Sequence, residues 1–433
     1  MKLKKRGLVN SLTSPDIINL VNKPTTVYCG LDPTAPSLHL GNLLALICLL
    51  HFNVLGHRVI TLIGGATGLI GDPSGRNVER KPLPQSTIEH NIVAIDRQIR
   101  KIFDNGRNYA SRRGYVSIYE SDNVIIKNNL EWFQKMTALD FLSDIGRYFR
   151  VGTMLTKDRI ENEGGISFTE FSYQLLQAYD FWYLYSYYNC QVQLGGSDQW
   201  GNITNGIDLI HKKSTFNNVK VNESKNPNIK KVYDAFGITI PLLLTSSGEK
   251  FGKSAGNAVW LDDKMTSAYE FYQYFMKISD ADVEKYLYLF TFLKGEEITQ
   301  ILKTHSESPE KHHAQEKLAS EATEMVHGLE GLRKARVATD IIFGTSIKNM
   351  KSQDIINAFS NDTQHLKSIK RNEVLNYTID RVAATSGVCK SRSEANKLIK
   401  AGGLYLNNER IDDSQYKLLE DDLLDGILFV FRT

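Results

Sequence analysis

The residues best suited to chemistry lie in a polar loop bounded by Gly30 and Gly41, which joins a short β-type run over residues 25–29 to an apolar helical run over 43–55. A strand-to-helix turn of this composition places backbone N–H groups where the phosphates of a nucleotide can lie. The same loop would also suit a tight turn followed by a helix that His39 caps, so it does not decide between these two interpretations by itself.

A second candidate phosphate-binding stretch is cationic and follows a predicted buried strand over residues 237–244. It carries Lys250 and Lys253, separated by Phe-Gly and followed by Ser254. A Walker-type loop needs a glycine with four residues between it and Gly-Lys-Ser, and Ser247 stands at that position, so this class of site does not fit. Two lysines spaced in this way can still contact a polyphosphate.

A long aromatic-rich segment over residues 168–188 has the apolar spacing of a helix. Tyr173, Gln177 and Asp180 recur in it at i, i+4 and i+7, which places all three on one helical face. Polar groups on the face of such an apolar helix form either a specificity pocket or a solvated stripe, and composition alone favours the stripe.

Further polar side chains follow two predicted buried strands where each strand ends in glycines. The strand over 58–63 leads to Asp72, which suits either an acceptor for an ammonium group or a turn aspartate. The strand over 191–194 leads to Gly196 and Asp198, and a carboxylate in that position can bind ribose hydroxyls. Neither glycine run has the G-x-G-x-x-G spacing, which disfavours a nicotinamide cofactor.

These chemical groups need a parallel sheet to position them. Strands that alternate with helices and end in glycines predict an α/β fold with a doubly wound, Rossmann-like parallel sheet. Other predicted elements are helices over 87–103 and 132–149, a strand or extended segment over 115–126, and a surface insertion over 214–231.

From residue 269 the pattern becomes helical and charged, which predicts a separate α-helical domain. The expected boundaries are residues 1–262, 263–355, a linker over 356–372, and a small helix–strand module over 373–433. A dense basic patch in that module suits contacts to a phosphate backbone, although a solvated charged face is an equally good interpretation. The patch consists of Arg381, Lys390, Arg392, Lys397 and Lys400.

Composition narrows the class of protein further. The 433 residues are 42% hydrophobic and 23% charged, with a net charge of +3, as expected for an ordinary globular protein. The longest apolar run, residues 43–50, is far shorter than the ~18 residues that a membrane span needs. Scattered cysteines without a C-x-x-C pair, and the lack of an H-E-x-x-H motif, argue against a protein-bound metal. The basic segment 1–6 lacks the apolar core of a secretory signal.

Taken together, these stretches resemble the tyrosyl-tRNA synthetases, class I aminoacyl-tRNA synthetases, and among them most closely the fungal mitochondrial members. Residues 39–42 (His-Leu-Gly-Asn) stand where the class carries His-x-Gly-His, and residues 250–254 stand where it carries Lys-Met-Ser-Lys-Ser. Residues 173–180 and 195–202 resemble the tyrosine-specific elements. Residues 387–411 resemble an S4-type RNA-binding module, and the helical domain before it takes the place of the family's anticodon-binding domain.

The resemblance implies that the chain attaches L-tyrosine to tRNA(Tyr) in two steps, through a tyrosyl-adenylate. ATP is then a substrate that brings Mg²⁺ with it, and neither a protein-bound metal nor an organic cofactor is expected. The resemblance also implies a homodimer, no association with membranes, and a location in the mitochondrial matrix, with the bacterial cytoplasm as the alternative.

The resemblance also implies roles for the residues of this sequence that match the family's site positions. The residues that match catalytic, charge-stabilising positions are Thr34, His39, Arg76, Arg80, Lys250 and Lys253. Those that match tyrosine-binding positions are Tyr28, Asp72, Tyr173, Gln177, Asp180 and Gln199. Those that match ATP-binding positions are Gly30, Asp32, His39, Gly41, Asn42, Gly196, Asp198, Lys250, Lys253 and Ser254.

Two details bear on specificity. A site that hydrogen-bonds the phenol of tyrosine leaves buried polar groups unpaired when phenylalanine enters, a principle for which the tyrosyl enzymes are themselves the standard example. Asn42 departs from the class motif by replacing its second histidine, but an asparagine still donates a neutral hydrogen bond, so activity should survive.

Two other functions remain open at this point. A tryptophanyl enzyme would share the fold, but an indole pocket has no use for the carboxylate of Asp180. An RNA-binding or splicing protein that has lost catalysis would share the carboxyl-terminal module. The retained His39, Lys250 and Lys253 favour catalysis, as does a chain that starts almost directly at the catalytic domain.

Overall fold

The computed structural model describes residues 2–72, 83–115, 123–152, 154, 167–221, 234–246, 251–254, 257–343, 347, 350–360 and 365–433, with the backbone alone at 170, 216–221, 253, 254 and 257. Contacts divide the chain into two compact units. The first contains residues 1–265 and 278–326, and the second contains residues 266–277 and 327–433.

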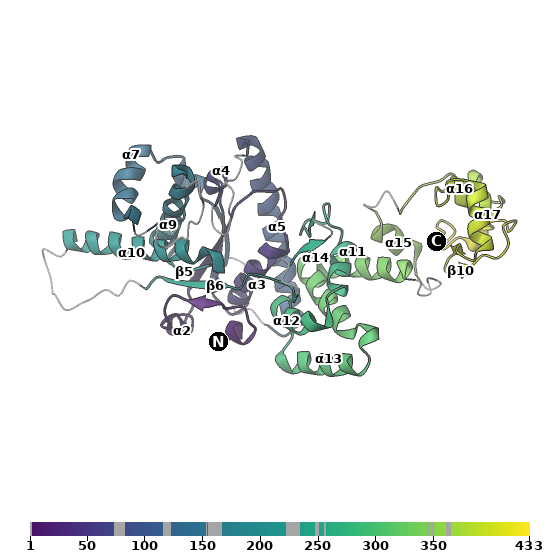
Figure 1. The fold of residues 1–433 in the computed structure, drawn as a ribbon, viewed down its shortest axis with the longest axis horizontal. Helices are drawn as coiled ribbons and strands as arrows, with labels where there is room; N and C mark the ends of the chain where they lie inside the picture. The colour runs from purple at the N-terminus through teal and green to yellow at the C-terminus, as the bar shows by residue number, and fades with distance from the viewer. Residues whose placement is uncertain are drawn as a thin grey trace. The chain divides into compact units, whose positions relative to one another are not determined.

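The first unit is built on a six-stranded sheet with the strand order β1-β6-β5-β2-β3-β4 (Figure 1). All neighbouring pairs are parallel except β1 with β6, which is antiparallel. The four inner strands β2, β3, β5 and β6 are mostly buried, as a sheet covered on both faces requires, and the edge strands β1 and β4 are half-buried. The six strands are β1 (Ser11–Leu12), β2 (Thr26–Leu31), β3 (Arg58–Ile63), β4 (Val124–Asn128), β5 (Cys190–Gly196) and β6 (Phe236–Ile240).

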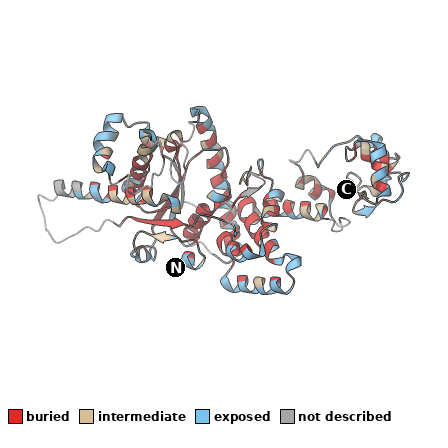
Figure 2. Ribbon diagram, in the orientation of Figure 1, coloured by how far each residue is buried: buried red, intermediate tan, exposed pale blue. Residues whose placement is uncertain are grey.

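The chain winds in both directions from the centre of this sheet. It runs from β2 outward through β3 to β4 and then returns to build β5 and β6 on the other side of β2. The connections contain the long helices α3 (Leu40–Val54), α5 (Gln85–Arg112), α9 (Phe168–Tyr188) and α10 (Trp200–Val221). Helix α3 is buried over nearly its whole length (Figure 2). This arrangement confirms the predicted doubly wound fold.

One predicted helix is wrong. Instead of a single helix over 132–149, the chain forms α6 (Leu130–Phe133), α7 (Ala138–Asp140), a π-helical turn (Phe141–Ile145) and a 3₁₀ turn (Gly146–Tyr148). The side chain of Thr137 caps α7, and the hydroxyl and carboxylate of Thr137 and Asp140 bond reciprocally to each other's backbone. A new helix start of this kind interrupts the apolar periodicity that the sequence suggested.

The remaining elements of the first unit are mostly helical. Helix α14 (His313–Ile342) begins in the first unit and contains a kink at Gly328, in the second, whose φ of 74° and ψ of 180° lie in a region essentially restricted to glycine. The elements are α1 (Lys2–Lys5), α2 (Ile17–Leu20), α4 (Thr67–Ile70), a 3₁₀ turn (Ser197–Gln199), β7 (Lys253–Ser254), β8 (Asn257–Ala258), α12 (Asp280–Phe290), α13 (Gly295–Glu307), a 3₁₀ turn (Pro309–Lys311) and the first part of α14 (His313–Ile342).

The second unit begins with a helical part and ends in a small α+β module. A three-stranded antiparallel sheet of order β10-β9-β11 packs there with two short helices. The elements are α11 (Ala268–Met276), the end of α14, α15 (Ser352–Ala358), a 3₁₀ turn (Arg371–Glu373), α16 (Ile379–Thr385), α17 (Arg392–Lys400), β9 (Tyr405–Leu406), β10 (Glu409–Arg410), a 3₁₀ turn (Glu420–Asp422) and β11 (Phe431–Arg432).

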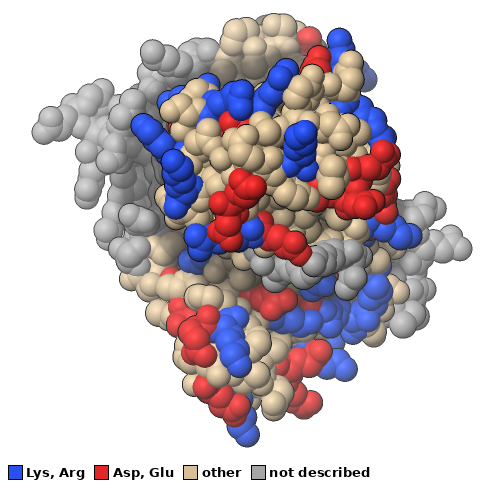
Figure 3. Space-filling model, turned by 90° about the vertical axis from the view of Figure 1, so that its right-hand side faces the viewer, with Lys and Arg blue, Asp and Glu red and all other residues tan. Residues whose placement is uncertain are grey.

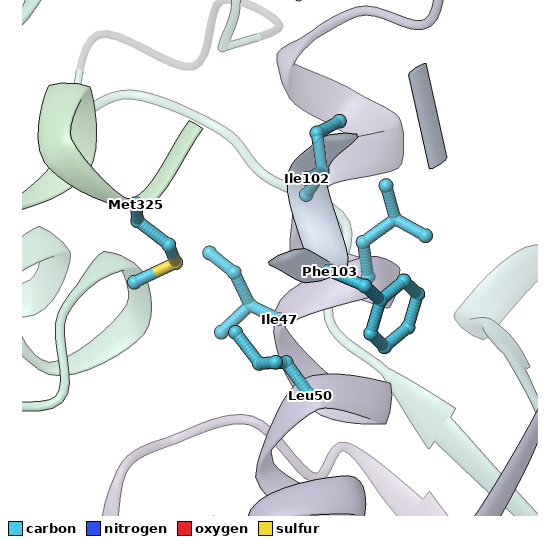
Figure 4. Close-up of a pocket in the computed structure, with 6 residues that line it drawn as sticks. Ile47, Leu50, Ile102, Phe103 and Met325 are labelled. Carbon is cyan, nitrogen blue, oxygen red and sulfur yellow. The ribbon is translucent and has the colours of Figure 1, made fainter. Parts of the chain in front are cut away.

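A small apolar pocket marks where α3 and α5 meet the first part of α14 (Figure 4). Leu50 and Phe103 line it together with Met325. Helix α5 approaches α3 closely at Gly106, where an added Cβ would lie 2.4 Å from the side chain of Leu50. In the part of the chain that is described, no helix is both long and apolar enough to cross a membrane.

Candidate active site

The sheet creates a crevice at the carboxyl ends of β2 and β5. These strands are neighbours, but the chain leaves them toward opposite edges of the sheet, and ligands of doubly wound proteins bind at such a switch point. Asp32 follows β2 there, and Gly196 ends β5 two residues before Asp198. An added Cβ at Gly196 would lie 2.3 Å from Oδ1 of Asp198, so any larger residue there would require the Asp198 carboxylate to move.

One group of polar side chains in the crevice surrounds two carboxylates. The hydroxyl of Tyr173 donates to Asp32 (2.9 Å), and the amide of Gln199 donates to Asp72 (2.7 Å). Burial raises the pKa of Tyr173, and the negative charges of Asp32 and Asp72 raise it further. Two carboxylates beside amide oxygens suit a ligand that carries an ammonium group.

The amide of Gln177 links this group to α10. Its Nε2 donates to Oε1 of Gln199 (3.1 Å), and its Oε1 accepts from Nδ2 of Asn202 (2.9 Å). The structure therefore brings together the predicted residues Asp72, Tyr173, Gln177 and Gln199.

A second group lies deeper and is centred on Asp180. This carboxylate is 3% exposed and accepts hydrogen bonds from the Trp132 indole (2.9 Å) and the Asn129 amide (3.1 Å). Burial raises the pKa of Asp180 well above its usual range, although these two donors act against the shift. A strongly perturbed carboxyl group in a crevice is a common feature of functional sites.

Tyr28 presents a buried hydroxyl in the same region. Its side chain is 1% exposed, and its hydroxyl has no hydrogen-bond partner among the described residues. Burial raises the pKa of Tyr28, and the charge of Asp180 raises it further, so the two groups are close. A buried hydroxyl without a partner is costly, which indicates that a polar group of a ligand completes this pocket.

Asn129 connects the two groups. Its amide nitrogen donates to Asp180 and to the hydroxyl of Thr67 (3.1 Å), and its carbonyl oxygen accepts from the backbone N–H of Ala66 (2.7 Å). Thr67 in turn donates to Asp32 (2.7 Å). A continuous hydrogen-bond network therefore joins the carboxylate of Asp180 in the deep group to the carboxylate of Asp32 in the outer group.

Sequence reasoning missed several members of this network. Asn129 follows directly after β4 and Thr67 begins α4 after β3, so both occupy strand carboxyl ends, where polar residues of this fold gather. That rule could have found them. Trp132 carried no comparable signal, because it lies in a short helix and its partner Asp180 is distant in sequence. Asn202 ends the stretch 195–202 that the sequence singled out and bonds Gln199 within it (3.2 Å), so that stretch could have indicated it.

His39 is the N-cap of α3. Its Nδ1 accepts from the backbone N–H of Gly41 (3.0 Å), and its own N–H donates to Oδ1 of Asn42 (3.1 Å). An Nδ1 that accepts leaves the proton of the neutral imidazole on Nε2, so His39 presents a donor. Desolvation lowers the pKa of His39, which favours this neutral form.

Residues near His39 form hydrogen bonds with the chain that follows residues 250–254, which we call the lysine motif. The N–H of Leu40 donates to the carbonyl of Val259 (3.1 Å), and the N–H of Leu261 donates to the carbonyl of Leu38 (2.8 Å). An added Cβ at Gly252 would lie 2.9 Å from Cβ of Leu40. The start of α3 and the backbone of β7 are therefore held close together.

Other predicted residues are placed as follows. Thr34 is exposed, and its backbone N–H donates to the carbonyl of Asp32 (2.9 Å). Gly30 is exposed with open space where a Cβ would stand. Only the backbone of Lys253 and Ser254 is described, and Arg76, Arg80 and Lys250 lie outside the described residues.

The predicted basic patch lies on and beside α16 and α17, and all five of its residues are exposed. Arg381 stacks on the ring of Tyr377, and Arg392 forms an ion pair with the buried carboxylate of Asp380 (2.9 Å). Arg392 therefore also has a structural role. Figure 3 shows that basic and acidic side chains are intermixed on the face that it draws.

No metal site is evident in the described ranges, where no three His, Cys, Asp or Glu side chains are grouped to hold an ion.

Comparison with known proteins places the chain in a family. The family model for class I tRNA synthetases (W and Y) matches residues 20–344, and the S4 domain model matches residues 378–424. The chain is 42% identical over 98% of its length to the chloroplastic/mitochondrial tyrosine–tRNA ligase of Arabidopsis thaliana, of which it covers 79%. It is 40% identical over 99% of its length to the tyrosine–tRNA ligase of Lactobacillus johnsonii, of which it covers 95%.

A solved structure agrees. The fold matches a C-terminally truncated mitochondrial tyrosyl-tRNA synthetase of Aspergillus nidulans with a TM-score of 0.69 and 36% identity, over 78% of this chain and 92% of that one. These matches confirm the resemblance that the sequence motifs suggested. The chain belongs to the tyrosyl-tRNA synthetases, class I enzymes that use ATP to attach tyrosine to tRNA.

Proposed function

We propose that this chain charges tRNA(Tyr) with L-tyrosine in two steps. In the first, a carboxylate oxygen of tyrosine attacks the α-phosphorus of ATP, the bond to the bridging oxygen breaks, and pyrophosphate leaves. In the second, a ribose hydroxyl at the tRNA end attacks the carbonyl carbon of the adenylate, and AMP leaves. The substrates supply both nucleophiles, so the protein contributes by binding the transition states more tightly than the ground states.

The deep group recognises the phenol. Asp180 and Tyr28 together hold one acceptor and one unpartnered hydroxyl in a buried space, which matches what a tyrosine hydroxyl needs. This is the observation that carries the proposal. The outer group of Asp72, Tyr173 and Gln177 receives the ammonium group, and Gln199 approaches the carboxylate.

The phosphates lie between the start of α3 and the lysine motif. The neutral His39, which donates from Nε2, and Thr34 hold one side, and Lys250, Lys253, Arg76 and Arg80 supply positive charge. Gly30, Asp32, Gly41, Asn42, Gly196, Asp198 and Ser254 complete the nucleotide site. Mg²⁺ arrives bound to the phosphates of ATP and neutralises part of the developing charge.

We also propose that the chain forms a homodimer. Large apolar side chains are exposed around α7 and at the start of α9, and a contact with a second copy would bury them. They are Leu139 (78% exposed), Leu142 (54%), Val151 (60%) and Phe168 (73%). We propose the mitochondrial matrix as its location, since relatives include mitochondrial enzymes; the bacterial relatives keep the bacterial cytoplasm as the alternative.

Pyrophosphate exchange into ATP without tRNA tests the activation step. We expect exchange that depends on tyrosine in the unmodified protein and falls by at least about a hundredfold in Asp180→Ala, because a buried charged hydrogen bond to the substrate is lost. Tyr187→Phe, at the exposed end of the same helix, is the matched control and should behave like the unmodified protein. Exchange that is absent with tyrosine, or equal with tryptophan, would overturn the assignment.

A further inference from the structure

Helix α12 holds the chain just before the lysine motif. One carboxylate oxygen of Asp282, Oδ2, accepts from the backbone N–H (3.1 Å) and the hydroxyl (2.9 Å) of Ser246. The ammonium group of Lys285 and the hydroxyl of Tyr286 both donate to the carbonyl of Leu244, at 2.9 and 3.2 Å. Asp282 is 7% exposed, so these bonds join a buried carboxylate of α12 to an exposed serine before the motif.

The same helix holds the chain inside the motif. The ring of Phe251 packs on the ring of Tyr286, with a centroid distance of 4.3 Å, and stacks on Phe290 at 5.3 Å. All three rings are buried. The N–H of Phe251 also donates to the carbonyl of Leu243 (3.0 Å), which links Phe251 to the chain that follows β6.

The chain at Gly252 is also bonded on the side away from α12. The carbonyl of Gly252 accepts from the N–H of Val259 (2.8 Å), next to the residues that pair with the start of α3. Gly252 itself has a φ of 88°, which favours glycine. The backbone that carries Lys253 is therefore fixed by α12 on one side and by the loop of His39 on the other.

We propose that α12 positions the lysine motif for nucleotide chemistry, with Asp282 and Tyr286 as positioning residues. Neither is assigned to contact a substrate. Each contacts the chain beside or within the motif. Asp282 accepts hydrogen bonds from Ser246, and Tyr286 donates to the carbonyl of Leu244 and packs on the ring of Phe251. This inference rests on the proposed function, in which the two lysines stabilise the departing pyrophosphate. Misplacing such charges by about 1 Å costs a large part of their effect on the transition state.

The test measures the rate constant of tyrosyl-adenylate formation, the KM for ATP and the Kd for tyrosine in single-turnover and equilibrium experiments. Ser246→Ala and Asp282→Ala should each lower the rate constant by about tenfold. The Kd for tyrosine should stay within about twofold, because tyrosine binds at the other side of the crevice. A double variant should lose no more than Asp282→Ala alone, since Asp282→Ala already removes the hydroxyl bond that Ser246→Ala removes, together with the bond to the backbone N–H.

Ser279→Ala is the matched control. The hydroxyl of Ser279 donates to the same oxygen of Asp282 (3.0 Å) but lies at the start of α12 and not beside the motif. It should leave the rate constant within about twofold of the unmodified protein, whereas Tyr286→Phe, which keeps the ring and removes only the hydroxyl, should lower it. If Asp282→Ala does not fold, Ser246→Ala carries the test, because its hydroxyl is at an exposed position.

The outcomes separate two failures. If the unmodified protein forms no adenylate, the proposed function is wrong. If it does, and Ser246→Ala and Asp282→Ala keep the full rate, or lose tyrosine affinity in proportion to the rate, then α12 only supports the fold and the positioning role is wrong.

Discussion

The carboxylates of the crevice differ in their burial and in the groups that donate hydrogen bonds to them. Asp180 is a buried carboxylate that keeps two neutral donors, whereas Asp32 and Asp72 lie nearer to solvent and accept from Tyr173 and Gln199. A carboxylate buried in this way does not stabilise the fold, since burial raises its pKa. Its retention is explained by a ligand that it must bind.

Tyr28 should show opposite effects on stability and on binding. We expect Tyr28→Phe to raise the free energy of unfolding of the free protein by ~1 kcal/mol, because it removes a buried hydroxyl that has no partner in the described structure. The same change should raise the KM for tyrosine by about tenfold and leave the KM for ATP unchanged.

Denaturant unfolding and pyrophosphate exchange measure these two effects. The matched control is Tyr109→Phe, because Tyr109 is also buried but its hydroxyl donates to Glu321 (2.6 Å), so the same deletion should lower the stability. Equal tyrosine affinity in Tyr28→Phe would show that its hydroxyl does not meet the substrate.

The sequence could place side chains that share one helix, but not the side chains that connect them to the rest of the crevice. Tyr173, Gln177 and Asp180 could be placed on one face because helical periodicity is local. The roles of Asn129 and Trp132 depend on contacts with residues about fifty positions away, and periodicity contains no such information. The side chain of Asn42 accepts a hydrogen bond from the N–H of His39, as the capping rules for helix starts predict. From the sequence alone, Asn42 was expected only as a donor that replaces the second histidine of the class motif.

At the scale of elements, strands and long helices were predictable, and interruptions were not. Residues 58–63 and 168–188 form the predicted strand and helix, because hydrophobic patterning is strongest in such segments. The segment 130–148 breaks into short turns that the rest of the chain holds in place. Asp144 of this segment forms an ion pair with the buried ammonium group of Lys213 on α10 (2.6 Å). The same ammonium group lies 4.1 Å from the ring centroid of Trp182.

Helix α3 contains a histidine that should make stability depend on pH. Burial lowers the pKa of His51 well below its ordinary value, and the nearby positive charges of Arg6 and Lys2 lower it further. Its ring stacks on Phe292 at 3.9 Å, where a charge is poorly solvated. The folded protein therefore keeps His51 neutral under conditions where the unfolded chain takes up a proton.

The sign of the effect follows from this difference. Above pH ~6.5 both states are neutral at this residue and its contribution is complete. As the pH falls below ~6.5, only the unfolded state binds the proton, so the free energy of unfolding drops by up to ~1.4 kcal/mol per pH unit until the folded pKa is reached. We expect His51→Leu to remove this part of the slope in urea unfolding between pH 7 and 5.

Leu46→Ala on the same helix is the control for that experiment. Leu46 is 1% exposed and lines the apolar pocket, so its truncation should lower stability by ~2–5 kcal/mol at every pH without changing the slope. A slope that stays the same in His51→Leu would show that His51 is not the group responsible.

For the whole molecule, the chain separates its chemistry from its second unit. All residues proposed to meet tyrosine or ATP belong to the first unit, and the S4 domain match lies in the second. The net charge of +3 hides this division, because the basic patch is local and acidic residues elsewhere balance it. Overall composition therefore could not indicate an RNA partner. The clustering of five basic residues around two short helices suggested phosphate contacts only as one of two equally good interpretations, and the match to the S4 domain model supports RNA binding by this module.

The basic patch should affect tRNA and not the activation step. Lys397 and Lys400 lie exposed on α17, and their combined replacement by alanine removes two charges without removing packed side chains. If each contacts a phosphate, the slope of log affinity for tRNA against log salt concentration should become shallower by ~1.4–1.8, since each contact releases counterions. Pyrophosphate exchange without tRNA should stay unchanged.

Filter binding at several salt concentrations, together with exchange on the same preparations, makes this measurement. Arg410→Ala is the control within the same module, because Asp412 already neutralises that charge at 3.0 Å, and it should leave the slope nearly unchanged. If the double lysine variant weakened tRNA binding equally at all salt concentrations, the loss would come from a changed fold, not from lost phosphate contacts. If it bound tRNA as tightly as the unmodified protein at every salt concentration, α17 would be a solvated face, and the tRNA would have to be held by other residues.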